Sequence, residues 1–113
     1  MAEPSLELLK GTLDVLILKT LSQGAMHGYG ISRSIRETTR EAFRVAEGAL
    51  YPALRRLEKR GLVEAEWSVT DTGREARVYD LTPAGTAELS AELRSWHRYV
   101  EAMGRVLGAA SGS

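Results

Sequence analysis

The 113-residue sequence contains no cysteine, and this absence excludes several kinds of chemistry. Without thiols the chain has no disulfide bridge, no thiolate nucleophile and no thiolate metal site, and it is compatible with a reducing compartment. Long apolar runs are also absent, since none approaches the roughly 18 residues of a membrane-spanning helix. The start, MAEPSLELLK, lacks a basic segment followed by an apolar one. We therefore expect a cytoplasmic protein.

Histidine is scarce, and the pattern around it does not indicate an enzyme. His27 and His97 lie far apart, and neither has an acidic partner at the spacing of a metal site or a catalytic triad. The GAMHGYG segment at residues 24–30 lacks the lysine of a phosphate-binding loop and the preceding strand of a dinucleotide fold. We expect no catalysis, no metal and no cofactor.

Charge is balanced overall but unevenly distributed. The formal net charge is zero, with 15 basic and 15 acidic residues. Eight basic residues stand against four acidic ones between residues 27 and 60, whereas residues 61–82 hold five acidic residues and only Arg74 and Arg77 as bases. Segregated charge gives a neutral protein a basic face that suits nucleic acid, although a solvated helical surface explains the same pattern.

Hydrophobic periodicity predicts three helices in the first half of a single domain. Apolar residues recur every three or four positions from Leu6 to Leu21, where the SQG sequence ends the first helix. A shorter helix is expected within residues 27–39. A third is expected to begin near Gly48 and to end at Gly61.

Pro52 lies among the apolar positions of this third helix, although a proline in a helix interior costs about 3 kcal/mol. The cost is avoided in the first turn, where the backbone N–H has no partner to lose. We therefore predict that the helix starts close to Gly48 and places Pro52 in its first turn. The exposed first turns then present Tyr51, Arg55 and Arg56.

The hydrophobic period changes from helical to alternating after residue 61. Alternation over residues 62–69 and 76–81 predicts two strands, and the TDTGRE sequence between them has the composition of a hairpin turn, with Gly73 suited to a positive φ. The apolar face of the first strand consists of Val63, Ala65, Trp67 and Val69. Three helices followed by a β-hairpin form a winged helix, a variant of the helix-turn-helix.

A last helix is predicted to start with Thr82 as N-cap and Pro83 at the first helical position. Its apolar residues are spaced four, three, four, three and four apart, as in a heptad seam. These residues are Leu89, Leu93, Trp96, Val100, Met103 and Leu107. Because a winged-helix core is complete without this helix, the seam predicts an interface with a second subunit. The end of the chain is flexible by composition.

Four features together resemble the PadR family of bacterial transcriptional regulators: HGYGIS, EGALYPALRRLEKRGLV, YDLTPAG and a single C-terminal helix. The resemblance covers residues 6–107. It implies a homodimeric winged-helix repressor in which the third helix reads the major groove, the hairpin reaches adjacent DNA and the C-terminal helix contacts the partner subunit. Ala84 departs from the family pattern, in which this position is often acidic.

We therefore expect a mostly α-helical fold with a β-hairpin wing. A winged helix-turn-helix DNA-binding domain would occupy residues 5–82, a C-terminal dimerisation helix residues 83–108 and a flexible tail residues 109–113. The expected function is sequence-specific, DNA-binding transcriptional regulation by a homodimeric repressor on a pseudo-palindromic operator. A winged helix that makes only protein–protein contacts is the alternative, and the segregated arginines argue against it.

Candidate DNA contacts come from three elements. Arginine on the third helix suits guanine or phosphate, arginine at the wing suits phosphate or the minor groove, and the start of the second helix suits phosphate. Each has a structural alternative, because Tyr51 also suits a core position, Tyr29 also suits packing against the third helix, and the arginines also suit solvent. The predicted DNA-binding residues are Tyr29, Ser32, Arg33, Gly48, Ala49, Tyr51, Pro52, Arg55, Arg56, Arg74 and Arg77.

Trp96 lies near the middle of the last helix, where it suits an interface anchor. Some members of the resembling family look to hold flat aromatic ligands between paired tryptophans of this helix, so Trp96 and Tyr99 are also candidate ligand-binding residues. Packing at the interface would by itself explain Trp96 fully, and it is the preferred interpretation. The expected partners are a double-stranded DNA operator, a second copy of the chain and a small aromatic effector that relieves repression, with no membrane.

Overall fold

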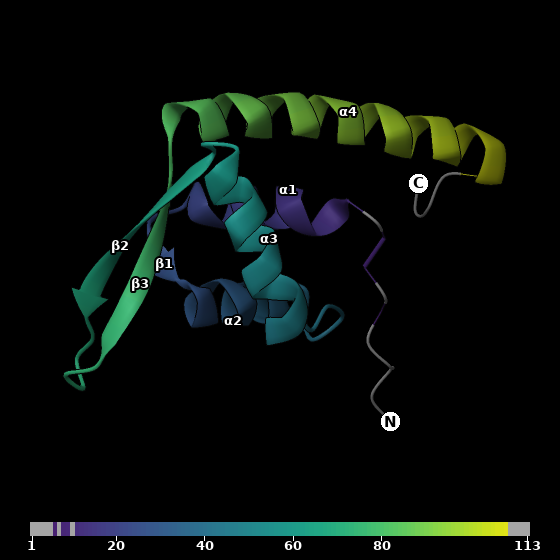
Figure 1. Ribbon diagram of the computed structural model, residues 1–113. Coiled ribbons are helices and arrows are strands. Elements are labelled where there is room, and N and C mark those ends of the chain that lie inside the picture. Colours follow the sequence, from purple (N-terminus) through teal and green to yellow (C-terminus); the bar gives the residue numbers. More distant parts are fainter. Residues whose placement is uncertain (1–5, 7, 10, 109–113) are drawn as a thin grey trace.

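The computed structural model describes residues 6, 8–9 and 11–108, so residue 5 and the predicted flexible tail at 109–113 lie outside the described residues. The elements in order are α1 (Thr12–Leu21), β1 (Met26–His27), α2 (Gly28–Thr38), α3 (Glu47–Lys59), β2 (Val63–Val69), β3 (Glu75–Leu81) and α4 (Pro83–Leu107). Figure 1 shows α1, α2 and α3 packed beside the β2–β3 hairpin, with α4 crossing the end opposite α2. This is the predicted mostly α-helical fold with a β-hairpin wing.

The sheet is antiparallel, with strand order β1-β3-β2. β2 pairs with β3 along its whole length, from Val63 opposite Leu81 to Val69 opposite Glu75. β1 was not predicted, because two residues are too few to carry a periodic pattern. It pairs only with residues 78–79, so the hairpin beyond them is two-stranded.

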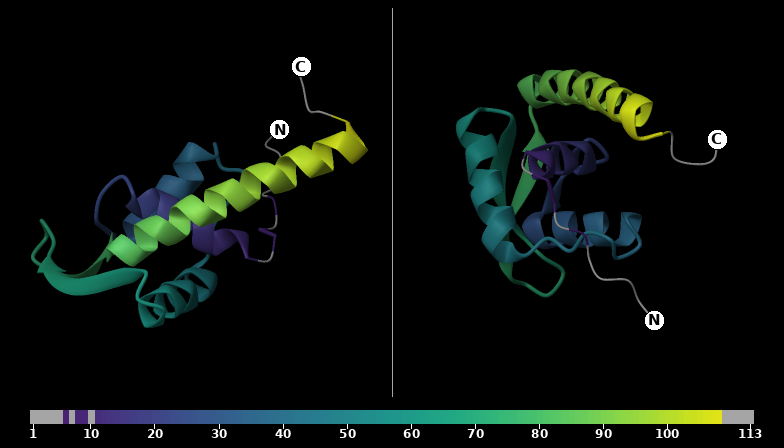
Figure 2. Two further views of the ribbon diagram at one scale, coloured as in Figure 1. Left: turned by 90° about the horizontal axis from the view of Figure 1, so that it is seen from above. Right: turned by 90° about the vertical axis from the view of Figure 1, so that its right-hand side faces the viewer.

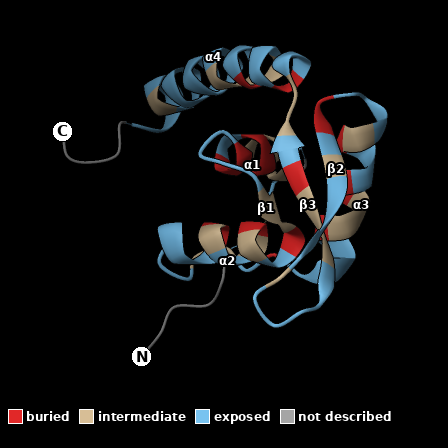
Figure 3. Cartoon of the chain, turned by 90° about the vertical axis from the view of Figure 1, so that its left-hand side faces the viewer, coloured by how far each residue is buried: buried red, intermediate tan, exposed pale blue. Residues whose placement is uncertain are grey.

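The core lies between the three-helix body and the inner end of the hairpin, as the buried positions in Figure 3 show. Burial of these apolar side chains stabilises the fold by about 25 cal/mol per Å². On β2 only the first apolar residue is buried, because the outer hairpin extends away from the core; Trp67 and Val69 are each 67% exposed. The buried apolar residues are Ile17, Leu18, Leu21, Ile31, Ile35, Val45, Leu50, Ala53, Leu54, Leu57, Leu62, Val63, Tyr79 and Leu89.

The first helix begins at Thr12 rather than at Leu6, so the prediction is wrong at its N-terminal end. Gly11 has a φ of 86°, a left-handed conformation that a continuous right-handed helix excludes. The Leu6 N–H donates to the carbonyl of Ala42 at 2.7 Å. Leu6 and Leu9 are exposed, and they lie outside any helix.

The third helix begins at Glu47, close to the predicted start at Gly48, but Pro52 lies in its second turn rather than its first. The Gly48 carbonyl, four residues earlier, therefore receives no hydrogen bond from position 52. Gly48 itself lies in the exposed first turn, and a Cβ added there would meet nothing within 4 Å. Water can reach the open carbonyl, which explains why an interior proline is tolerated here.

The last helix starts as predicted. Thr82 Oγ1 accepts a hydrogen bond from the Gly85 N–H at 3.0 Å, and Pro83 is the first helical residue. Gly85 is required by close approach, because a Cβ there would lie 2.0 Å from the backbone oxygen of Leu62. The start of α4 is therefore held tightly against the turn between α3 and β2.

Candidate nucleic-acid interface

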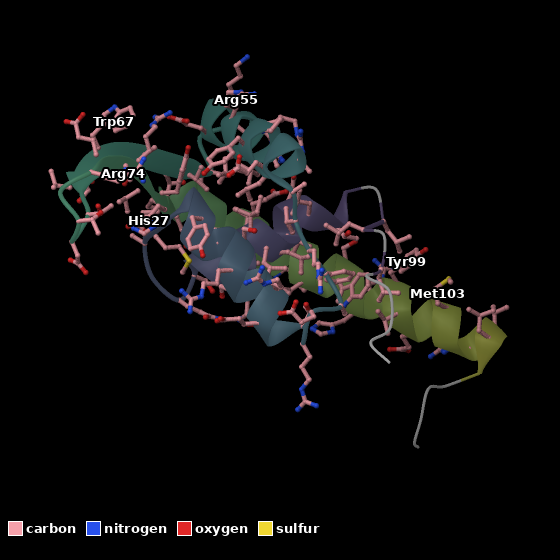
Figure 4. The ribbon with its side chains drawn as sticks, turned by 90° about the horizontal axis from the view of Figure 1, so that it is seen from below. His27, Arg55, Trp67, Arg74, Tyr99 and Met103 are labelled. Atoms are coloured by element: carbon pink, nitrogen blue, oxygen red, sulfur yellow. The ribbon has the colours of Figure 1, made fainter. Side chains whose placement is uncertain are left out.

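A groove of about 620 Å³ separates the outer hairpin from α3 and the start of α2. Figure 4, seen from below, shows His27 at the end of β1, Arg55 on α3, and Trp67 and Arg74 on the hairpin, all of which line this groove. Three elements far apart in sequence thus meet at one surface. The predicted DNA-binding residues that line it are Tyr29, Tyr51, Arg55, Arg74 and Arg77.

The side chains of α3 divide between two flanks, because successive residues turn by about 100° around a helix axis. Tyr51 and Arg55 line the groove on the hairpin side. Arg56 points to the opposite flank, where its Nη2 lies 3.1 Å from Asp14 Oδ1 of α1. Arg56 is therefore neutralised by α1 and lies outside the groove in which it was expected to act.

Arg55 and Arg74 are exposed cations of the groove that form no ion pair with any residue the structure describes. Arg74 is held at the hairpin turn by its backbone, since its N–H donates to Thr70 Oγ1 at 3.2 Å and its carbonyl accepts from the Thr70 N–H at 2.8 Å. Gly73 closes the turn at a φ of 82°, as predicted. Two unpaired guanidinium groups suit anionic phosphate or the edge of guanine.

Tyr51 forms part of the groove wall and part of the packing beneath it. The residue is half-buried and packs against the core. Its ring lies so close to Gly28, at the start of α2, that a Cβ there would be 2.7 Å from Cε1 and from the hydroxyl oxygen. The absence of a side chain at position 28 is therefore what lets the Tyr51 ring reach the first turn of α2.

The three predicted DNA contacts at the start of α2, Tyr29, Ser32 and Arg33, have different environments. Tyr29 is 67% exposed, which contradicts its alternative as a packing residue. Ser32 Oγ donates to the Val45 carbonyl at 3.1 Å and so holds the segment that leads into α3. Arg33 Nε donates to Glu37 at 3.0 Å, and this hydrogen bond raises the pKa of Arg33, which stays charged. Ser32 and Arg33 do not line the groove.

Gly48, Ala49 and Pro52 lie on the first two turns of α3, outside the lining of the groove. Gly48 and Ala49 are exposed and Pro52 is half-buried. The N-cap residue, Ala46, makes no side-chain hydrogen bond to the first turn. The N–H groups of this first turn carry partial positive charge, which suits a DNA backbone, and the carboxylate of Glu47 in the same turn offsets part of it.

Arg77 lines the groove but is not the free wing-tip cation that the sequence suggested. Its Nη2 lies 3.0 Å from Glu58 Oε2 of α3. Its guanidinium carbon lies 6.0 Å from the ring centroid of Trp67 and 5.7 Å from that of Tyr79. Burial raises the pKa of the Tyr79 phenol, and the charge of Arg77 acts in the opposite direction. Arg77 is therefore neutralised by a carboxylate and covered by two aromatic rings.

Sequence reasoning missed eight of the residues that line the groove. They are His27, Gly28, Trp67, Thr70, Thr72, Glu75, Ala76 and Tyr79. Trp67 was placed on the apolar face of its strand, and only the position of the hairpin outside the core reveals that the ring is exposed. The hydroxyl oxygens of Thr70 and Thr72 lie 3.0 Å apart in the turn. Threonine on both sides of an aspartate in a predicted wing tip was the available signal for a polar contact surface.

The apolar seam of α4 that was predicted to form a dimer interface has two parts, one buried against the chain's own core and one exposed. Leu89 is 6% exposed and belongs to the core of its own chain, so it leaves the predicted interface. Leu93 is half-buried against the same core. The C-terminal part of α4 extends past the body, as the left view of Figure 2 shows. The exposed large apolar residues on this distal part are Trp96, Tyr99, Val100, Met103, Val106 and Leu107.

Two hollows lie where α4 leaves the body. One, of about 380 Å³, is lined mainly by apolar residues of the N-terminal segment, α1 and the α2–α3 loop, among them Leu9, Val15 and Phe43. The other, of about 340 Å³, includes Trp96 and Tyr99, whose rings stack at 6.1 Å between centroids and 20° between planes. The candidate ligand residues thus lie together at the edge of a hollow.

The described residues offer neither a metal site nor a membrane-spanning helix. No three histidine, cysteine, aspartate or glutamate side chains among them are grouped so that they could hold a metal ion. None of the helices that the structure describes has the length and apolar character needed to cross a membrane.

Residues 17–91 match the sequence profile of the Transcriptional regulator PadR-like family. The chain belongs to this family. Transcriptional regulator Rv3488 of Mycobacterium tuberculosis is 42% identical over 79 residues, which are 70% of each chain. Because PadR-like proteins are transcriptional regulators, the expectation that this chain is not an enzyme is confirmed by its family.

Two solved structures of transcriptional regulators have a fold similar to that of this chain. A transcriptional regulator from Clostridium thermocellum is 30% identical, with a TM-score of 0.80 over 87% of this chain and 95% of the other. PadR of Bacillus subtilis in complex with operator DNA is 27% identical, with a TM-score of 0.67. The match to that protein covers 75% of this chain and 47% of the other, so the Bacillus protein is substantially longer.

Proposed function

We propose that this PadR-like regulator is a homodimeric repressor that binds a specific DNA sequence through the groove between α3 and the hairpin. One observation carries the proposal: the groove gathers Arg55 of α3 and Arg74 of the hairpin turn, both exposed and without an ion pair in the described part of the chain. The PadR structure from Bacillus subtilis contains operator DNA, which supports DNA as the ligand of this fold. Such a regulator works in the cytoplasm, where bacterial DNA lies.

In the proposed complex α3 enters the major groove. Arg55 binds guanine or a phosphate oxygen there, and Arg74 at the hairpin turn binds phosphate or the minor groove of flanking DNA. Tyr29 and Tyr51 supply hydroxyl and ring contacts to the backbone from the groove wall. The exposed start of α3, around Gly48, lies against a phosphate of the same strand.

The dimer is proposed to form through the distal half of α4. Val106 is 84% exposed and Leu107 is 72% exposed, which is unusual for large apolar side chains that follow one helical stripe. The apolar hollow of about 380 Å³ beside Leu93 offers a complementary surface on the same molecule. A second copy that places its distal α4 along α4 and α1 of the first would cover both surfaces.

Repression follows from occupancy of a promoter by this dimer. A two-fold dimer recognises a pseudo-palindrome. Release of the dimer from the DNA requires a change in the relative orientation of the two subunits. A flat aromatic effector bound beside Trp96 and Tyr99 would change this orientation. It would weaken operator binding only as far as it prefers the non-binding geometry.

Selection from a pool of random-sequence duplexes tests the proposed DNA binding. We expect enrichment of an inverted repeat with half-sites about one helical turn, roughly 34 Å, apart. Affinity for the enriched duplex should fall steeply with salt, because each neutralised phosphate contributes about 0.9 to the log–log slope. A pool that shows no enrichment, with the protein folded and dimeric, would support the alternative of a winged helix that binds only proteins.

Fluorescence titration tests the proposed effector site. With Trp67 replaced by Phe, emission reports Trp96 alone, and planar cationic and neutral aromatic compounds are added in turn. A ligand of the site should change the emission of this variant and, at the same concentration, lower the affinity of the parent protein for the enriched duplex. If a broad panel changes neither, Trp96 is a packing residue and the effector part of the proposal fails.

A further inference from the structure

The outer hairpin has little support from the rest of the fold. β1 pairs with Val78 and Tyr79 of β3, and Arg77 is the next residue toward the tip, the first beyond the reach of β1. From there outward β2 and β3 pair only with each other. A two-stranded ribbon is marginally stable in water, so its angle to the body must be fixed by contacts other than strand pairing.

Arg77 makes contacts of the required kind. It lies directly opposite Trp67 across the hairpin, and its guanidinium lies near both the Trp67 ring and the Tyr79 ring. Tyr79 is fixed, since it is 5% exposed in the core. Among ion pairs between described residues, the one between Arg77 and Glu58 is the one that joins the hairpin to a helix. Arg77 thus links both strands of the wing to α3.

The same contacts argue against Arg77 as a phosphate ligand. Its charge is balanced by Glu58 at 3.0 Å, and both side chains are about two-thirds buried, with 37% and 34% of their surface exposed. Arg77 Nε is buried without a hydrogen-bond partner among the described residues, because the neighbouring side chains cover it. A phosphate would have to displace Glu58 to reach this guanidinium, whereas Arg55 and Arg74 have no ion-pair partner among the residues that the structure describes.

We propose that Arg77 is a positioning residue that, with Glu58 and Trp67, holds the hairpin at a fixed distance from α3. The effect of this positioning on DNA binding rests on the proposed function. With the hairpin fixed, Arg74 at the tip and Arg55 on α3 keep the separation that lets both residues contact one duplex. Arg77 itself need not touch the DNA.

Double electron–electron resonance tests the positioning directly and without DNA. The chain has no cysteine, so Ala49→Cys on α3 and Thr72→Cys in the turn give two unique spin-label sites. Labelled chains are diluted into excess unlabelled chain so that each dimer carries one label pair. We expect one narrow distance distribution in the parent protein and a clearly broader one after Glu58→Gln or Arg77→Gln.

Glu88→Gln is the matched control, because it removes a comparable ion pair that joins the C-cap of α3 to α4 and not to the hairpin, that of Arg60 with Glu88 at 3.2 Å. The distribution should stay narrow in this variant. Circular dichroism confirms that every variant is folded. Equal distributions in the parent protein, Glu58→Gln and Arg77→Gln would overturn the proposal.

DNA binding separates positioning from direct contact. Glu58→Gln removes a negative charge near the DNA, so electrostatics alone predict equal or tighter binding to every duplex. Positioning predicts about fivefold weaker binding to the enriched duplex, the effect of one partly exposed ion pair, with no loss on a mixed-sequence duplex. Arg77→Gln should likewise weaken specific binding and leave the salt slope unchanged.

The outcomes distinguish the two proposals. Loss of about 0.9 in the salt slope after Arg77→Gln, with equal weakening on both duplexes, would make Arg77 a phosphate ligand and overturn its positioning role. If the parent protein enriches no duplex, the proposed function fails, and the distance distributions alone decide whether Arg77 fixes the hairpin.

Discussion

Two neighbouring arginines on α3 have different environments, although they are identical in chemistry. Arg55 faces the groove without an ion pair in the described structure, and Arg56 faces Asp14 on the other flank. The rotation of about 100° between consecutive helical residues is enough to separate them. Their contributions to DNA binding should therefore differ sharply.

Substitution of each arginine by alanine tests this difference. Arg55→Ala should weaken binding to the enriched duplex by about 1–3 kcal/mol, because a base or phosphate contact is lost. Arg56→Ala removes the same charge and should cost well under 1 kcal/mol, the range of an exposed ion pair. Fluorescence anisotropy with labelled duplex measures both. Equal losses would show that only net charge matters and that Arg55 has no specific contact.

Gly85 provides a prediction about stability. Gly85→Ala should destabilise the fold by about 1–3 kcal/mol or more, since its Cβ would overlap the backbone oxygen of Leu62, which cannot move aside freely. Gly48→Ala is the matched control, because its Cβ meets nothing within 4 Å and alanine favours a helix by about 1 kcal/mol. Urea unfolding at one chain concentration should show opposite signs for the two variants. A stable Gly85→Ala protein would mean that α4 is not held against this turn.

At this scale the sequence predicted five of the residues that line the groove, but not the rest of its lining and not which cations are paired. Tyr29, Tyr51, Arg55 and Arg74 line it as residue type and position indicated. The pairing of Arg77 could not be predicted, because its partner lies 19 positions away on another element. Ion pairs between distant elements depend on tertiary geometry that no local pattern contains.

At the scale of elements, cap and turn residues predicted the ends of helices and strands correctly, whereas hydrophobic spacing alone did not. The capped start of α4 and the glycine turn of the hairpin were predicted, because cap and turn residues act on their own backbone. The first helix was predicted too long, since a leucine stripe continues across Gly11 while the backbone does not. The position of Pro52 was also wrong, because solvent exposure at the start of α3 was not visible in the sequence.

Glu92 gives a prediction about pH at the junction of α4 with α1 and α3. The pKa of Glu92 is raised, mainly because burial disfavours the charged carboxylate. A hydrogen bond with Glu88 and the negative charges of Glu88 and Asp14 raise the pKa further, and the positive charge of Arg60 lowers it in part. A carboxyl group with a raised pKa contributes stability below its ordinary titration range, and this contribution is lost as pH rises through the folded value. At neutral pH the charged Glu92 is therefore unfavourable.

Glu92→Gln should thus stabilise the protein at neutral pH and lose this advantage in acid. The gain should be a few tenths of a kcal/mol, because the group is largely solvated and its interactions are screened. Melting temperatures of parent and variant at acidic and neutral pH measure it. Glu66→Gln, at an exposed position of β2, is the control and should change little at either pH. A variant less stable than the parent at neutral pH would contradict the inferred sign.

At the scale of the whole molecule, the distal part of α4 presents large apolar side chains that the described structure leaves 42–84% exposed. Met103→Glu should shift the protein toward monomers, because a charge would be buried in the proposed interface. Sedimentation velocity measures the shift, and circular dichroism should show the helix content of each chain largely retained. Ser90→Glu adds the same charge to an exposed position of α4 next to the body and should leave the dimer intact. A Met103→Glu protein that remains dimeric would move the interface elsewhere.

Trp96 should contribute more to the interface than its neighbours. Trp96→Ala is expected to weaken the dimer by at least about 1 kcal/mol, because a large aromatic near the centre of the seam is lost. Dissociation on dilution, followed by sedimentation equilibrium, measures this change. An unaltered dissociation constant would place Trp96 at the rim and leave ligand binding as its remaining role.

Because Leu89 is anchored in the core while the side chains from Val100 onward are exposed, α4 can act as a lever that turns about its buried end. At 1.5 Å per residue the arm from Leu89 to Leu107 is about 27 Å long, so a tilt of about 10° moves its end by about 5 Å. Successive base pairs are separated by about 3.4 Å. In a dimer joined through these arms, so small a tilt displaces α3 from its half-site by more than one base pair.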